Sequence, residues 1–293
     1  MPHLIRGSPR QLLVHMMKVE VLPCGAEIRD VDLGVMSKSD FQDVNELFCE
    51  HGLVFFRDQS IDETEHIRLA ERWGEINTNR FFRAHEDYPQ IAMVSKEPDQ
   101  TVNIGGGWHT DHSYDFEPAL GSILVARELP PGGGDTWFTS MYRAYDSLSD
   151  GLKKTLEGLN AVHSARHVFG RRNVDANEAT SGRIGNAEAA DELHDPVHPV
   201  VIRHPLSGRK ALYVNPGFTL RFDGWSAEDS QALLQYLYQH ASKEEFVTCF
   251  HWQPGSIAFW DNRATWHMAQ NDYQGQRRVM HRITIEGCAL ERA

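Results

Sequence analysis

The sequence predicts an α+β fold with a mainly β core, in which an antiparallel sheet sandwich carries helices at its periphery. Three observations support this prediction: strand-forming segments occur both early and late in the chain, helical segments lie before and between them, and no linker rich in proline, glycine or charge divides the 293 residues. A hydrophobic content of 41% is sufficient for one large core. We therefore expect a single domain over residues 17–293, preceded by a loose extension over residues 1–16.

The first predicted element is a helix over residues 37–52. Apolar side chains recur at helical spacing through this segment, and Gly52 is a typical signal for the end of a helix. Ser39 or Asp40 is the expected N-cap, because short polar side chains accept hydrogen bonds from the N–H groups of the first turn. Residues 53–56 are apolar throughout and predict a buried strand directly after this helix.

The later elements follow from the same periodicities and from turn signals such as the Pro-Pro-Gly-Gly-Gly segment at residues 130–134. We expect further helices over residues 63–73, in two short pieces over 141–159, and over 226–240. We expect further strands over residues 121–129, 136–140, 198–202, 211–214, 246–252, 257–260 and 279–285. The stretch 171–195 is polar and poor in apolar residues, so we interpret it as a candidate lid.

The composition excludes several classes of protein. There are 29 Lys and Arg residues against 41 Asp and Glu, and the resulting net charge of −12 argues against nucleic-acid and membrane-surface partners. No apolar run approaches the roughly 18 residues of a membrane-spanning helix, and the N-terminal segment lacks the features of a secretory signal. The four cysteines form no Cys-x-x-Cys pair, so we expect free thiols in a cytoplasmic protein.

The segment from Trp108 to His112 contains the strongest candidate for chemistry. On an extended strand, residues i and i+2 point to the same face, so His109 and Asp111 would present an imidazole and a carboxylate side by side. These are two corners of the facial triad of non-haem Fe(II) oxygenases, which leaves coordination positions open for a co-substrate and O2. Without a third ligand, a simple His–Asp hydrogen bond would explain the pair equally well.

A zinc hydrolase is a weaker alternative for the same segment. The pattern His-x-Asp-His resembles half of the His-x-His-x-Asp-His metallohydrolase motif. Gly107, however, stands where the first histidine of that motif would be, and His112 would point away from Asp111 on a continuing strand.

The C-terminal third supplies a candidate third ligand and two anion-binding residues. His267 would come from a distant strand near the C-terminus. Arg278 and Arg282 share one face of the closing strand and lie roughly 13 Å apart at strand rise. Because a guanidinium binds a carboxylate in a bidentate manner, two separate anions near the metal are the simpler interpretation of this pair.

Four motifs taken together resemble the taurine/2,4-dichlorophenoxyacetate dioxygenases. They are Trp108–Asp111, Gly133–Thr136, Trp260–His267 and Arg278–Arg282, and the likeness extends from about residue 19 to residue 287. The resemblance implies a double-stranded β-helix (jelly roll) that uses Fe(II), 2-oxoglutarate and O2 and releases succinate and CO2. It also implies that His109, Asp111 and His267 hold iron, that Thr136 and Arg278 bind the distal carboxylate of 2-oxoglutarate, and that Arg282 binds the acidic head group of the substrate.

The same resemblance gives an expectation for the substrate. This chain has Asn79 and Phe82 where the taurine enzymes place a substrate-binding His and Tyr. The other positions that would surround the substrate are His112, Tyr114, Phe169, Phe218 and Trp266. An aromatic pocket with one arginine favours a small anion that is bulkier and more apolar than taurine, such as a sulfonate, a sulfate ester or a carboxylate. The alternatives are taurine itself and a non-catalytic β-helix binding protein. Family likeness further suggests a homodimer or homotetramer.

Overall fold

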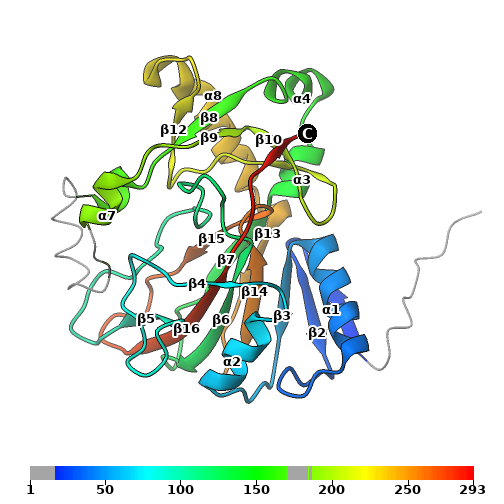
Figure 1. Ribbon diagram of the computed structural model, residues 1–293, viewed down its shortest axis with the longest axis vertical. Coiled ribbons are helices and arrows are strands. Elements are labelled where there is room, and N and C mark those ends of the chain that lie inside the picture. Colours follow the sequence, from blue (N-terminus) through cyan, green and yellow to red (C-terminus); the bar gives the residue numbers. More distant parts are fainter. Residues whose placement is uncertain (1–16, 171–183, 185–186) are drawn as a thin grey trace, which may run out of the picture.

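The computed structural model describes residues 17–170, residue 184 and residues 187–293. The predicted N-terminal extension, residues 1–16, and most of the predicted lid lie outside the described residues. The described part is built on sheets, with helices at their periphery (Figure 1). The predicted fold class, a mainly β core with flanking helices, is therefore confirmed at this level.

The largest sheet has eight strands, and its order places β3, from the first quarter of the chain, beside β14, from the last quarter. Its path is β1 (Lys18–Val21), β2 (Ala26–Arg29), β3 (Leu53–Phe56), β14 (Ile257–Asp261), β6 (Gly121–Glu128), β16 (Arg278–Ile285) and β4 (Ile76–Asn77), with β5 (Ala92–Lys96) pairing to β16 off this path. The pair β2–β3 is parallel. The prediction of an antiparallel sheet is therefore wrong for this one pair among the described strands.

A second, three-stranded sheet packs against the inner face of the large sheet. Its order is β13 (Val247–Phe250), β7 (Thr136–Ser140) and β15 (Thr265–Ala269). The ring of Phe55 on β3 stacks on Phe250 with centroids 4.1 Å apart, and it meets Phe138 edge-on at 5.5 Å. These buried contacts form the core between the two sheets.

Helices α1 (Lys38–His51) and α2 (Glu63–Ala70) cover the other face of the large sheet (Figure 1). Phe48 of α1 stacks on Phe259 of β14 with ring centroids 3.9 Å apart. The N-cap of α1 is Ser37 rather than Ser39 or Asp40, because Asp40 takes the third helical position and completes a capping box with Ser37. Gly52 ends the helix as predicted, with φ of +70°.

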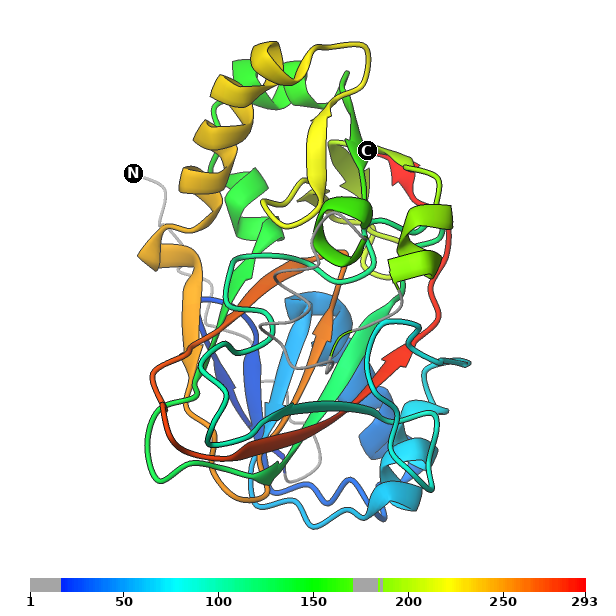
Figure 2. The ribbon, with the colours of Figure 1, turned by 90° about the vertical axis from the view of Figure 1, so that its left-hand side faces the viewer.

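The remaining elements lie at one end of the molecule (Figures 1 and 2). They include the helices α3 (Met141–Asp146), α4 (Asp150–Leu156), α5 (Arg166–Phe169), α7 (Ala187–Glu192) and α8 (Ala227–Ala241) and the short 3-10 helix η2 (Glu244–Phe246). They also include two three-stranded sheets, β12 (Thr219–Phe222), β8 (Asn160–His163) and β9 (Val197–Pro199), and β11 (Lys210–Leu212), β10 (Val201–Arg203) and β17 (Glu291–Arg292). A core shared by α3, α8 and these strands holds this end together.

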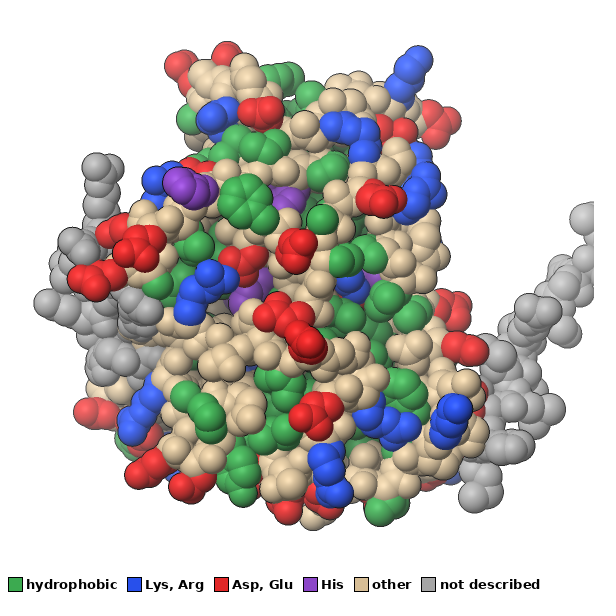
Figure 3. Space-filling view, viewed as in Figure 1, with side chains coloured by type: hydrophobic (Ala, Val, Ile, Leu, Met, Phe, Trp, Pro, Cys, Tyr) green, Lys and Arg blue, Asp and Glu red, His purple; other side chains and the backbone are tan. Residues whose placement is uncertain are grey.

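On the face shown in Figure 3, acidic and basic side chains of the described residues are interspersed rather than gathered into a broad positive field. Among the described residues, there is no helix with the length and apolar character needed to span a bilayer.

Candidate active site

Two histidines that are far apart in the sequence are held together by their own backbones. The N–H of His109 donates to the carbonyl of His267 at 3.1 Å, and the N–H of His267 donates to the carbonyl of His109 at 2.8 Å. This reciprocal pair is an antiparallel bridge between β15 and the 105–110 segment. Residues paired in this way point their side chains to one face, and the two imidazole centroids are 4.2 Å apart.

Asp111 joins this pair from a turn rather than from a strand. The predicted strand over this segment is wrong, because only His109 is bridged and residues 111–114 form a turn. The hydroxyl of Thr110 donates to the carbonyl of Asn262, which fixes the start of the turn against the loop after β14. Asp111 Oδ1 lies 3.7 Å from His109 Nε2, and Asp111 Oδ2 lies 3.8 Å from His267 Nε2. The three side chains therefore converge as predicted, for a different local reason.

A glycine allows the main chain to pass close behind this site. A Cβ at Gly217 would lie 2.7 Å from the Cβ of His109, so any larger residue there would push the histidine out of place. The imidazole of His109 is also oriented by the carbonyl of Gly107, to which its Nδ1 donates at 2.7 Å. This hydrogen bond leaves the lone pair of Nε2 directed at Asp111 and His267.

The protonation states suit a divalent cation. Burial, followed by the proximity of His109, lowers the pKa of His267 to about 3, so its imidazole is neutral at physiological pH. Burial acts against the charged form of Asp111, yet the Arg282 guanidinium and the two histidines hold the pKa of this carboxyl well below its usual range. Two imidazoles and one carboxylate, with donor atoms within 4.8 Å of one another, are a ligand set for a metal ion such as Fe(II).

Arg278 and Thr136 offer a place for an anion next to this set. Thr136 begins β7, and its hydroxyl accepts a hydrogen bond from Trp252 Nε1 at 3.0 Å. Arg278 begins β16 and is 4% exposed, and its Nε and Nη2 have no hydrogen-bond partner among the described residues. Burial also lowers the pKa of this guanidinium, which indicates a poorly solvated charge. A buried guanidinium with unused donors fits a carboxylate ligand such as the distal end of 2-oxoglutarate.

Arg282 contacts the site from further along β16. Its Nη1 donates to Asp111 Oδ2 at 3.1 Å, and its guanidinium lies 4.3 Å from the centroid of the Phe82 ring. Its Nε is buried and has no partner among the described residues. One anion, Asp111, is therefore already bound to Arg282, and part of the guanidinium is left for a second.

Both arginines and the three candidate ligands line one cavity of about 340 Å³. Of the predicted substrate residues, Phe82, Tyr114, Phe169, Phe218 and Arg282 line it. The aromatic ones form a cluster, in which Tyr114 meets Phe218 at 4.7 Å and Phe81 stacks on Phe169 at 4.3 Å. Ile184, which lies within the predicted lid, bridges to Phe82 and also lines the cavity.

Three other predicted residues lie outside this lining. Asn79 is occupied locally, because its Oδ1 accepts hydrogen bonds from the N–H groups of Phe81 and Phe82. His112 has a φ of +60° and directs Nδ1 to Asp115 Oδ2 at 2.8 Å. Trp266 is buried in the core at the opposite side of β15. We therefore correct the expectation that these three side chains face the substrate, because turn and strand geometry turns each one elsewhere.

Sequence reasoning also missed several residues that line the cavity. They are Val94, Ile104, Gly105, Trp108, Leu124, Val168, Ile184, Pro216, Gly217, Trp260 and Ala269. Trp260 is notable, because its ring lies 4.7 Å from that of His267 and its buried Nε1 has no partner among the described residues. They come from strands, one helix and loops that are scattered along the chain, so the sequence gives no single periodic signal for them.

A histidine pair and a carboxylate on one side of a metal, with open positions on the other, are the ligand set of non-haem iron oxygenases. The β sandwich, this ligand set and the adjoining arginine cavity place the chain in that class.

Comparison with known proteins supports this class and identifies the family. The family described as "Taurine catabolism dioxygenase TauD, TfdA family" matches residues 18–284, so the chain belongs to this family. An alkylsulfatase of Acinetobacter baylyi is 34% identical over 90% of this chain and 82% of its own length. An α-ketoglutarate-dependent sulfate ester dioxygenase of Pseudomonas putida is 30% identical over 93% and 91%. The crystal structure of a taurine dioxygenase from Burkholderia xenovorans superposes with a TM-score of 0.77, at 30% identity, over 94% of this chain and 92% of that chain.

The predicted reaction class and cofactors are therefore confirmed at the level of the family. The chain is an Fe(II)- and 2-oxoglutarate-dependent dioxygenase that consumes O2. The zinc hydrolase and the non-catalytic binding protein are no longer needed as explanations of the site.

Proposed function

We propose that this dioxygenase oxidises a small organic anion with an apolar tail, and that its preferred head group is a sulfate ester or a sulfonate. One observation carries the proposal: Arg282 Nε has no partner among the described residues, and the guanidinium lies on the ring of Phe82, which packs against a cluster rich in aromatic side chains. A single buried cation selects an anionic head group, and the aromatic wall selects an apolar tail.

The roles of the other residues follow from the same geometry. His109, Asp111 and His267 would hold Fe(II), and Thr136 and Arg278 would bind the distal carboxylate of 2-oxoglutarate. The large sheet and the sheet β13–β7–β15 would form the two halves of a double-stranded β-helix, with the ligands at its open end. Strong support comes from the unused donors of Arg278, which face the same cavity as the three ligands.

The protein positions the substrate next to the metal ligands and excludes water from the reacting carbon. Iron, 2-oxoglutarate and O2 together supply the oxidising chemistry, with succinate and CO2 as products. Arg282 contacts Asp111 at 3.1 Å, so a head group bound to Arg282 brings its first carbon next to the metal ligands. Hydroxylation of a carbon that bears a sulfate oxygen gives an unstable hemiacetal ester, which breaks into an aldehyde and inorganic sulfate. The aromatic cluster excludes water from this carbon.

Taurine fits this cavity less well than an apolar anion. An ammonium group needs a polar partner, and Asn79, the nearest candidate in sequence, is engaged with the backbone of Phe81 and Phe82. The alkylsulfatase and the sulfate ester dioxygenase named above also favour a sulfate ester over an aminosulfonate. A carboxylate head group remains chemically compatible with Arg282 and belongs in the same test.

The test is succinate release under Fe(II) and 2-oxoglutarate across matched substrates. We expect a medium-chain alkyl sulfate or sulfonate to be turned over, and taurine and the corresponding uncharged alcohol to stimulate little release. In Arg282→Gln, we expect KM for the anion to rise by about 100-fold, equivalent to about 2.7 kcal/mol, while KM for 2-oxoglutarate changes little. Arg278→Gln is the matched control and should show the reverse pattern.

Two outcomes would contradict the proposal. One is turnover of taurine in preference to every apolar anion. The other is an unchanged KM for the anion in Arg282→Gln when iron binding to that variant is intact.

We also propose a homodimer or homotetramer in the cytoplasm. Light scattering coupled to size exclusion tests the oligomeric state directly, and a monomer would contradict it.

A further inference from the structure

Two clusters of metal-ligating side chains lie outside the iron site among the described residues. One consists of Glu63, His85 and His281, and the other of Asp135, Cys249 and His251. We propose that the second cluster is a separate binding site for a thiophilic divalent cation of the Zn²⁺ class.

The strand register brings the three side chains of this cluster together. In the antiparallel pair of β13 and β7, Cys249 lies opposite Trp137 and Phe250 lies opposite Thr136. Continuing this register by one residue places His251 opposite Asp135, with Cys249 on the diagonal and on the same face. Trp137 and Cys249 are both exposed, so this is the outer face of the small sheet. His267 is paired with Phe138, whose buried ring marks the inner face.

One carboxylate oxygen already contacts both of the other donors. Asp135 Oδ2 accepts a hydrogen bond from His251 Nδ1 at 2.7 Å and one from the Cys249 thiol at 3.7 Å. A cation that replaces these shared protons would have sulfur, nitrogen and oxygen ligands, with the solvent side open for water. The ligand set contains a thiolate, so it favours Zn²⁺ over hard cations such as Mg²⁺ or Ca²⁺.

The local charge also favours a cation. Asp272 lies close by, because its Oδ1 accepts the N–H of Gly134, and it adds a second negative charge beside the thiol. Partial desolvation and the Asp135 carboxylate raise the pKa of the Cys249 thiol to about 11, so the thiol is protonated when no cation is bound. Arg278 is near enough to Asp135 for an electrostatic interaction, but it is buried and lines the cavity on the inner side.

Binding of the cation requires two protons to leave the ligand atoms. The Cys249 thiol would release its proton to water when the sulfur binds the cation. The proton on His251 Nδ1 would move to Nε2 through solvent, since this side chain is 72% exposed. No oxidation or reduction takes place.

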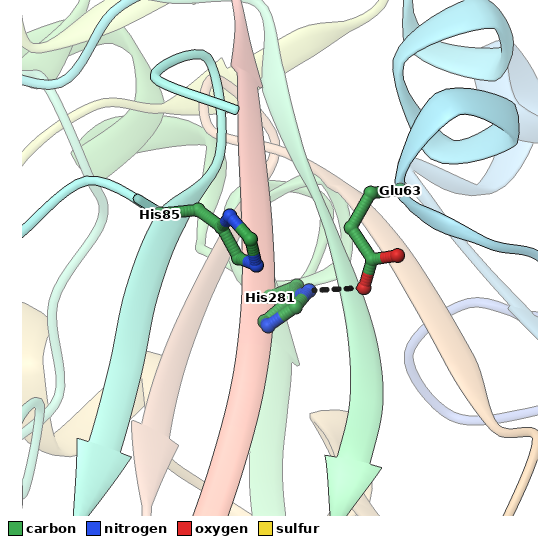
Figure 4. Close-up of side chains that lie close together, drawn as sticks. All are labelled: Glu63, His85 and His281. Atoms are coloured by element: carbon green, nitrogen blue, oxygen red, sulfur yellow. Dashed lines mark ion pairs between the residues drawn. The ribbon is translucent and has the colours of Figure 1, made fainter. Parts of the chain in front are cut away.

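The other cluster is a poorer cation site for a specific reason. Glu63, His85 and His281 lie side by side between α2 and the large sheet (Figure 4). Arg127 Nε donates to His281 Nδ1 at 3.1 Å, and Arg127 Nη2 lies 3.5 Å from Glu63 Oε1. The guanidinium thus uses the only lone pair of this nitrogen and occupies the position next to the carboxylate.

Cobalt titration tests the proposal on the full-length protein after removal of metals. The iron site has no sulfur ligand, so a sulfur-to-cobalt charge-transfer band in the near ultraviolet reports only the Cys249 site. We expect this band in the wild type and in Cys288→Ser, the matched exposed cysteine, and we expect its loss in Cys249→Ser. Total Co²⁺ bound per chain should fall from two to one in Cys249→Ser, with 2-oxoglutarate turnover under Fe(II) retained.

A second measurement locates the site by residue. Zn²⁺ should protect Cys249, but not Cys288, from alkylation by iodoacetamide, as read by mass spectrometry of the labelled peptides. His251→Gln should abolish this protection. A wild-type protein with no thiolate band, or equal alkylation of Cys249 with and without Zn²⁺, would overturn the proposal.

Discussion

The two faces of strand β16 carry similar sets of side chains with different chemistry. On the inner face, two histidines, one carboxylate and Arg282 meet around the candidate iron site. On the outer face, His85, His281 and Glu63 of α2 lie close together (Figure 4), and Arg127 donates a hydrogen bond to His281. His281 and Arg282 are consecutive residues, so strand alternation alone sends one to each face.

The difference lies in which atom the arginine contacts. Arg282 donates to a carboxylate oxygen of Asp111, and a carboxylate has further lone pairs for a metal. Arg127 donates to His281 Nδ1, and that nitrogen then has none left. A shared list of residue types therefore does not define a metal site, because the contact of the nearby cation decides whether the ligand atoms remain available.

A matched pair of histidine variants gives the largest expected effect. His267→Gln should lower turnover by at least about 1,000-fold, or about 4 kcal/mol, because it removes one of three metal ligands. His85→Gln should leave kcat within about two-fold, since its ring lies on the other face of β16. Succinate formation and Fe(II) binding are the measurements. An equal loss of turnover in the two variants would contradict the distinction between the two faces of β16.

The outer cluster should instead contribute to stability. In Arg127→Met, His281 and Glu63 lose a charged partner, and the carbonyl of Ile61 loses the hydrogen bond from Nη1. We expect the free energy of unfolding to fall by about 1–3 kcal/mol, with KM values unchanged. Urea denaturation measures it, and Arg83→Met, at an exposed position, is the control. An unchanged free energy of unfolding in Arg127→Met would show that the contacts of Arg127 in this cluster do not stabilise the fold.

The smallest effect concerns acid stability. Burial, with Arg127 and His281 nearby, lowers the pKa of His66 to about 3, below the value of about 6.5 expected in the unfolded chain. Between about pH 3 and about pH 6.5, His66 therefore binds a proton in the unfolded chain but not in the folded one. The contribution of neutral His66 to the free energy of unfolding is complete above about pH 6.5 and is lost as the pH falls toward about 3.

The variant His66→Leu should flatten this dependence. We expect its free energy of unfolding, measured in urea at about pH 7 and about pH 5, to differ less between the two conditions than that of the wild type. A wild-type slope in His66→Leu would show that His66 is not the titrating group.

Elements with strong periodicity could be predicted from the sequence, and the others could not. The helices α1 and α8 have long apolar stripes and capping residues, and their predicted spans match the structure closely. The strands β1, β2, β4, β5, β8, β12 and β17 were missed. Two to five residues long, and fully exposed in the case of β1, they form because a partner strand is available, which a local pattern does not show.

The candidate site divides in the same way. His109, Asp111, His267 and Arg278 could be found from the residue types that a metal site with a nearby anion needs, and Thr136 could be found from the resemblance of its motif to the family. The residues that would surround the substrate could not be predicted reliably, because several of them lie in loops, where local hydrogen bonds decide which way each side chain points. Asn79 is the clearest example, since its amide oxygen accepts hydrogen bonds from the N–H groups of Phe81 and Phe82, and it is Phe82 that lines the cavity.

The reciprocal backbone pair between His109 and His267 links assembly of the enzyme to its metal. These residues are far apart in the sequence, with His109 in the middle third and His267 in the last third, so the ligand set exists only after β15 has closed on the 105–110 segment. A shift of β15 by one residue would turn His267 to the far side of its sheet and abolish the set. Ferrous ion in the cell would thus select chains with the correct strand pairing and stabilise them by mass action.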